Sequence, residues 1–99
     1  MSTLHVICHS PFGDNRLSSC LRLLGSADGL LLCGDAVYAL QPGSEPLRTL
    51  QASQLDGRLF ALDEDLQARA IAISDLGKAV DYPAFVALSL HYDKVNSWL

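Results

Sequence analysis

Three cysteines are the residues of this sequence whose chemistry is easiest to name. Cys8, Cys20 and Cys33 stand 12 and 13 positions apart. No two of them have the Cys-x-x-Cys spacing of zinc knuckles and thioredoxin-type dithiols. In a reducing cytosol they stay thiols, and each is either a small core hydrophobe or a reactive group. The number of cysteines does not decide between these roles.

The position of each thiol along the chain is more informative. Cys8 and Cys33 each end a stretch that we expect to be a buried strand, which favours core packing for both. Cys20 belongs to an apolar helical stripe, together with Leu17 and two further leucines. It lies in the middle of that helix, where the dipole stabilises a thiolate little, and Arg16 would supply only weak positive charge. On the residues alone, packing is the favoured role of Cys20 as well.

Other polar residues suggest chemistry less strongly. His9 lies just past the first expected strand, where α/β proteins place functional groups, but a loop histidine bonded to nearby backbone is the more frequent case. The acids at 63–65 stand at an expected helix start, where carboxylates cap the helix and suit its dipole. Asp35 is likewise expected to cap a short helix. The sequence contains no G-x-G-x-x-G, P-loop or G-x-S-x-G motif, so nothing supports a nucleotide-binding or hydrolase function.

Strand and helix signals alternate along the chain. β-prone stretches bounded by turn residues predict strands at 3–8, 30–33, 58–62 and 78–81. Capping residues and apolar spacing predict helices from Asp14 or Asn15 to Gly25, over 47–53, over 63–71 and over 83–91. This alternation predicts an α/β fold: a mostly parallel sheet of four or five strands with helices on both faces. Residues 1–99 form a single domain, because the chain is too short for a second core.

Composition bears on partners and location. The chain is 49% hydrophobic and only 18% charged, with a mean hydropathy of +0.22. Apolar surface is therefore expected to face partner subunits, and the apolar tail at 92–99 is expected to dock on its own domain or on a neighbour. The net charge is -4 and the basic residues are scattered, which argues against direct nucleic-acid binding. With no signal-peptide pattern and no long apolar run, we expect a cytoplasmic protein that makes no membrane contact.

Five segments, taken in order, resemble one known family. They are Leu4-His5 with Ser10-Pro11-Phe12, Leu30-Leu31-Leu32 with Asp35-Ala36-Val37-Tyr38-Ala39, and the stretches 62–69, 80–86 and 95–99. No single segment is specific, but the ordered set spans essentially the whole chain and is similar to the DsrH/TusB family of sulfur-relay proteins. Asp35-Ala36 departs from the acid–glycine pair usual in the family at that place. The resemblance implies a small three-layer DsrE-like domain.

The resemblance also implies partners and a task. Family members work in cytoplasmic heterohexamers, two copies each of three related subunits, so TusC/DsrF-like and TusD/DsrE-like subunits are expected. Persulfide sulfur passes to a TusE/DsrC-like acceptor and then to the enzyme that thiolates the tRNA wobble uridine, so tRNA is reached only indirectly. The main sulfur-carrying cysteine belongs to the TusD/DsrE-like subunit. We therefore expect a subunit of a sulfurtransferase complex rather than an enzyme acting alone.

The role of Cys20 stays open under this resemblance. DsrH-type members carry a cysteine in the first helix, and Cys20 stands at the matching place, although some TusB members lack it. Cys20 is thus a candidate sulfur carrier, with packing as the alternative. Neither a cofactor nor a metal is implied. Three functions remain: a TusB-like relay subunit for tRNA thiolation, a non-catalytic structural subunit that completes the hexamer, or a DsrH-like subunit of dissimilatory sulfur oxidation.

Overall fold

Strands and helices alternate along the chain in the computed structural model, which describes residues 2–73 and 75–98. In order they are β1 (Thr3–Ile7), α1 (Arg16–Leu23), β2 (Gly29–Leu32), the 3-10 helix η1 (Gly34–Leu40), α2 (Glu45–Ala52), β3 (Leu59–Leu62), α3 (Asp63–Ala68), β4 (Lys78–Val80), α4 (Tyr82–His91) and β5 (Lys94–Trp98). The strands form one five-stranded sheet in the order β4-β3-β2-β1-β5, and each neighbouring pair is parallel. The parallel α/β fold expected from the sequence is confirmed.

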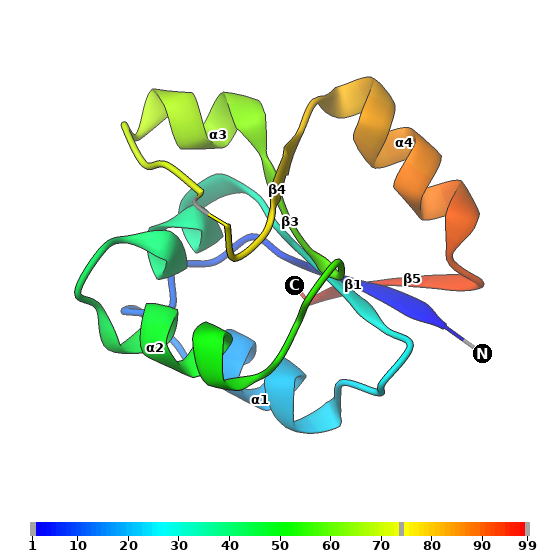
Figure 1. The fold of residues 1–99 in the computed structure, drawn as a ribbon, viewed down its shortest axis with the longest axis horizontal. Coiled ribbons are helices and arrows are strands. Elements are labelled where there is room, and N and C mark those ends of the chain that lie inside the picture. Colours follow the sequence, from blue (N-terminus) through cyan, green and yellow to red (C-terminus); the bar gives the residue numbers. More distant parts are fainter. Residues whose placement is uncertain (1, 74, 99) are drawn as a thin grey trace.

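The direction of the crossovers explains how the helices are distributed. From β1 to β4 the chain steps along the sheet in one direction, and right-handed connections then place their helices on one face. The connection from β4 to β5 returns past the whole sheet, so α4 lies on the opposite face. Figure 1 shows α1 and α2 together on one side of the strands and α4 on the other. One face is thus covered by several helices and the other by α4.

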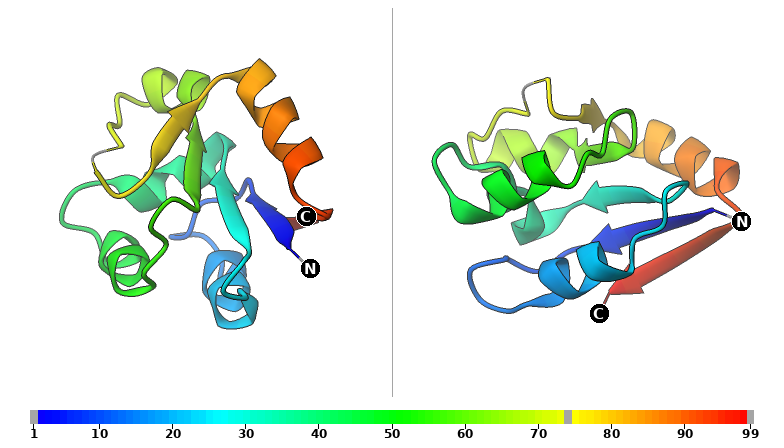
Figure 2. Two further views of the ribbon diagram at one scale, coloured as in Figure 1. Left: turned by 45° about the vertical axis from the view of Figure 1, so that its right-hand side comes forward. Right: turned by 60° about the horizontal axis from the view of Figure 1, so that its bottom comes forward.

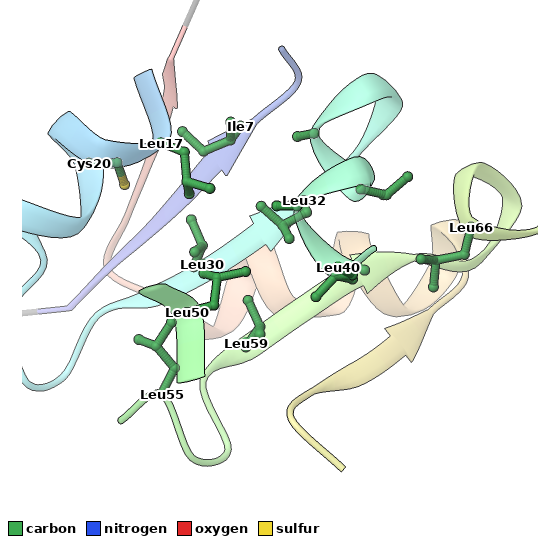
Figure 3. Packing of buried hydrophobic residues seen from close by; sticks show 14 residues of the cluster. Ile7, Leu17, Cys20, Leu30, Leu32, Leu40, Leu50, Leu55, Leu59 and Leu66 are labelled. Carbon is green, nitrogen blue, oxygen red and sulfur yellow. The ribbon is translucent and has the colours of Figure 1, made fainter. Parts of the chain in front are cut away.

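The larger part of the core lies on the face covered by several helices. Its buried residues come from β1, β2 and β3 and from α1, η1, α2 and α3, and include Ile7, Leu17, Leu30, Leu50 and Leu66 (Figure 3). The α4 face has a smaller cluster of Leu4, Val6, Leu31, Phe60 and Val80, against which Ala84, Phe85 and Leu88 of α4 pack. Every residue of β2 and β3 is buried, which explains why both strands read as unbroken apolar runs.

The C-terminal tail forms the edge strand β5. It pairs with β1 from Thr3 opposite Lys94 to Ile7 opposite Trp98, and the two strands run side by side in Figure 2. The indole N–H of Trp98 donates to Nδ1 of His5 at 3.1 Å. The expectation that the tail docks is therefore confirmed, and it docks on its own domain.

Several expectations about element ends were wrong. Asp35 is not a cap: Cys33 occupies the N-cap position of η1, and the Asp35 carboxylate pairs with Arg69 instead. The acids at 63–65 lie within the first turn of α3, whose N-cap Leu62 makes no side-chain cap bond. The helix ends at Ala68 rather than at 71 because Ala70 adopts a φ of 53°, which breaks the helical path.

The predictions that Cys8 and Cys33 are core residues need correction as well. Cys8 is exposed and Cys33 is half-buried. The reason is that β1 ends at Ile7 and β2 at Leu32, so both thiols lie one residue beyond the strands, at the edge of the sheet, where α4 covers Cys33 only in part.

Candidate functional site

Two thiols that are far apart in sequence meet at the carboxyl edge of the sheet. Cys8 follows β1 and Cys33 follows β2, and their Sγ atoms lie 2.8 Å apart. In parallel α/β sheets this edge is where ligands and reactive groups gather. Reasoning from Cys-x-x-Cys spacing missed the pair, although each cysteine follows an apolar run and neighbouring parallel strands end together. A cysteine directly after each of two neighbouring parallel strands is the sequence signal that could have revealed the pair.

The two sulfurs have unequal surroundings. Cys8 is open to solvent, whereas the S–H of Cys33 donates to the carbonyl oxygen of Ile7 at 3.6 Å. Burial, the hydrogen bond with Cys8 and the nearby Asp65 carboxylate together raise the pKa of the Cys33 thiol well above its ordinary value. Cys8 is therefore the outer thiol and Cys33 the inner one.

An ionic cluster beside these thiols holds the turn after β2. Arg69 Nη2 lies 2.9 Å from Asp35 Oδ1, and Arg69 Nη1 lies 3.5 Å from Asp65 Oδ1. The other oxygen of Asp65 accepts the backbone N–H of Gly34 at 2.7 Å. Gly34 has a φ of 52°, a conformation that favours glycine. The Arg69 guanidinium also lies 5.8 Å from the centroid of the Tyr38 ring. The cluster connects η1 to α3 and fixes the backbone next to Cys33.

Cys20 lies away from this edge, inside the core. Its side chain is fully buried and points from α1 toward the sheet, beside Leu17 (Figure 3). Burial, with a smaller contribution from Asp28, raises the pKa of the thiol to about 12. Arg16, considered as a positive neighbour, pairs with Asp14. In this conformation the Cys20 thiol is protonated at neutral pH and closed to solvent.

Within the described residues, the hydrogen bonds of the histidines are made with groups other than thiols. His5 is buried, with Nε2 at 3.4 Å from Asp28 Oδ2 and Nδ1 accepting from Trp98. The acceptor role of Nδ1 requires the proton to be on Nε2, facing the carboxylate. The hydrogen bonds of His5 with Asp28 and Trp98 therefore link three segments: β1, β5 and the loop that precedes β2. His9, the histidine favoured on sequence grounds, is exposed, and it slightly lowers the pKa of Asp14 after the larger effect of the Arg16 backbone amide.

Residues 2–73 and 75–98 contain no group of three His, Cys, Asp or Glu side chains placed to hold a metal ion. Within the same residues, no helix has the length and apolar character needed to cross a membrane.

The fold and the sheet edge define a small parallel α/β domain of a known kind. The crystal structure of the ychN protein from E. coli superposes on this chain with a TM-score of 0.74, covering 99% of this chain and 100% of that one at 21% identity. At that identity the likeness concerns the fold alone, and it supports the small α/β architecture with a parallel sheet that was expected from the sequence.

Sequence comparison then identifies the family. The DsrH-like protein family matches residues 9–95, so this chain belongs to that family. Protein TusB of Erwinia tasmaniensis is 37% identical over 97 residues, which cover 96% of this chain and 99% of that protein. Protein TusB of Yersinia enterocolitica and Protein TusB of Yersinia pestis are each 36% identical with the same coverage. The family expected from five ordered segments is confirmed.

Proposed function

We propose that this chain is a TusB-like subunit of a cytoplasmic sulfur-relay complex that supplies persulfide sulfur for 2-thiolation of the tRNA wobble uridine. The observation that carries the proposal is the similarity to TusB proteins at 36–37% identity over 96% of the chain. The acidic net charge of -4 and the scattered basic residues support an indirect route to tRNA through other proteins.

The outer surface of α4 supports a place in an assembly. Tyr82, Val86 and Leu90 are spaced by four residues and form one stripe, here called the outer stripe of α4, on the side away from the sheet. Their exposed fractions are 51%, 56% and 81%. A helix with apolar residues on all sides is ordinarily covered on all sides, yet no α4 residue is buried in this chain alone.

The partners proposed for this surface are related subunits. TusC/DsrF-like and TusD/DsrE-like chains would complete a heterohexamer with two copies of each subunit. A TusE/DsrC-like protein would accept the sulfur from that complex. Covering Val86 and Leu90 would contribute less than the about 1.5–3 kcal/mol gained when a fully exposed side chain is buried, because both are already partly covered.

Deletion of the gene tests the proposal. Wobble 2-thiouridine in bulk tRNA should fall strongly in the deletion strain and return when the wild-type chain is supplied from a plasmid. Unchanged thiolation in the deletion strain would contradict the tRNA role. In that case, reverse sulfite-reductase genes beside this gene would favour a DsrH-like role in dissimilatory sulfur oxidation.

A second candidate function is a structural subunit that carries no sulfur. The complete burial of Cys20 and the raised pKa of its thiol favour it. Cys20→Ala, which leaves an apolar side chain in the core, should then restore tRNA thiolation to the wild-type level. Loss of persulfide loading in a purified, fully assembled Cys20→Ala complex would instead support the proposal of Cys20 as a sulfur carrier.

A further inference from the structure

The thiol pair at the sheet edge plays no part in the function proposed above. Ile7 and Leu32 are register partners in the parallel pairing of β1 with β2. Cys8 and Cys33 are therefore the next facing pair of the same ladder. Alternation along the strands places both side chains on the α4 face, and Cys33 packs against the core cluster of that face. The register thus holds the two sulfurs together at 2.8 Å.

The backbone at this place suits a covalent link. Neighbouring strands lie about 4.8 Å apart, and the Cα atoms of disulfide-bonded cysteines are about 4.4–6.8 Å apart. The strands are still paired here, because the amide of Cys33 donates to the Ile7 carbonyl at 3.0 Å. A bond between the sulfurs therefore needs side-chain adjustment and no separation of the strands.

The difference in access gives the two thiols different roles. Cys8 is exposed, so a dissolved reagent meets its sulfur first. Cys33 is half-buried and its S–H is bonded to the Ile7 carbonyl, so it meets Cys8 more readily than a dissolved reagent. An accessible attacking thiol with a second thiol within reach to resolve the mixed disulfide is an arrangement that suits thiol–disulfide exchange.

We propose that Cys8 and Cys33 form a reversible intramolecular disulfide by exchange with a low-molecular-weight disulfide. The Cys8 thiol gives its proton to water and the thiolate attacks one sulfur of the small disulfide, whose S–S bond breaks to release one thiolate. Cys33 then loses its proton and attacks Sγ of Cys8. The mixed disulfide breaks, the Cys8–Cys33 bond forms, and a second small thiolate leaves. The protein loses two electrons and two protons, and the small disulfide gains them as two thiols.

Oxidised glutathione is the probe for the test, applied to the full-length purified chain after reduction and removal of the reductant. Trypsin cuts after Arg16, Arg22 and Arg48, so each cysteine falls in a separate peptide: 1–16, 17–22 and 23–48. We expect peptide 1–16 to become linked to peptide 23–48 with the loss of two hydrogen atoms, and dithiothreitol to reverse the link. This wild-type experiment decides the proposal even if a variant fails to fold.

Single variants identify the order of attack. Cys33→Ser should accumulate glutathione on Cys8 at about tenfold or more above the wild-type level, because the neighbouring resolving thiol is gone. Cys8→Ser should react slowly, since Cys33 is shielded. Cys20→Ala is the matched control and should form the same linked peptides as the wild type. Stable glutathione on wild-type Cys8, a link to peptide 17–22, or no linked peptide would each overturn the proposal.

Discussion

The three thiols of this chain lie in three different surroundings. Cys8 faces solvent, Cys33 lies half-buried beside it, and Cys20 is enclosed between α1 and the sheet. A thiolate forms most easily where water or positive charge can stabilise it, and burial raises the pKa of Cys20 to about 12. The residue that the family resemblance singles out is therefore the most deeply buried of the three thiols.

Asp28 makes the stability of the chain depend on pH. Burial pushes the pKa of its carboxyl upward, but hydrogen bonds from the backbone amides of Gly25 and Thr3 and from His5 outweigh it, so the pKa lies below the ordinary 3.8. Between the two values the unfolded state binds more protons than the folded state. The stabilising contribution is therefore complete above pH 3.8 and is lost as the pH falls through the lower pKa of the folded state.

We expect Asp28→Asn to flatten the acid limb of the stability curve. Urea unfolding at a series of pH values from neutral to strongly acid measures it. Asp56→Asn, at an exposed carboxyl, is the matched control and should keep the wild-type slope. An unchanged slope in Asp28→Asn would show that other carboxyls control the acid limb.

At the scale of elements, β5 is held by one side-chain hydrogen bond as well as by its pairing with β1. Trp98→Phe removes the indole N–H and leaves Nδ1 of His5 without that donor. We expect the free energy of unfolding to fall by about 1 kcal/mol, the usual net value of one such bond. Denaturant unfolding measures the loss. In a His5→Leu background the same change should cost less, and equal costs in both backgrounds would rule out the bond as the cause.

The end of α4 passes close to the start of β2. A Cβ atom at Gly29 would lie 2.6 Å from Cζ of Tyr92, the C-cap residue of α4. Gly29→Ala must therefore displace the end of the Tyr92 side chain, and we expect a loss of about 1 kcal/mol, the low end of the range for overpacked sites, because a side-chain tip moves more easily than backbone. Thermal unfolding measures it. Gly13→Ala is the control, because its nearest neighbour would be the carbonyl oxygen of Ser10 at 3.9 Å. Equal melting temperatures in the two variants would contradict this close approach.

At the scale of the whole molecule, a single return crossover leaves α4 alone on its face of the sheet. That helix uses one side to cover the sheet and exposes the outer stripe of α4 on the other. The exposed apolar side chains Tyr82, Val86 and Leu90 thus lie together on one helix, where subunits of the proposed complex would meet, whereas Phe12, Leu23 and Val95 are exposed elsewhere.

Val86→Asp tests that surface directly. The side chain is 56% exposed, so we expect the isolated chain to keep its free energy of unfolding within about 0.5 kcal/mol. Co-purification of partner subunits should be lost, because an unpaired carboxylate would have to be buried at the interface. Leu23→Asp on α1, at a residue 70% exposed on the other face of the sheet, is the matched control and should keep its partners. Full co-purification with Val86→Asp would exclude the outer stripe as the interface.

Local patterns determined much of this protein in advance. Apolar runs predicted the strands β2 and β3, and the run that ends at Cys33 was expected to be buried. Helical spacing predicted that Cys20 faces the core, as it does. Ordered segments along the chain identified the family. These features follow from hydrophobic periodicity and composition. Both are properties of short stretches of chain, so they can be recognised in the sequence without knowledge of the fold.

Only the tertiary structure decided which residues meet. The sequence did not reveal that β5 pairs with β1, that Trp98 reaches His5, or that Cys8 and Cys33 touch although 25 positions separate them. The acids at Asp35 and 63–65 were expected to cap helices. In the structure Asp35 pairs with Arg69, Asp65 accepts from the Gly34 amide, and Asp63 accepts from Gln67. Such contacts depend on strand order and crossover direction, which are set by packing of the whole chain and by no local pattern.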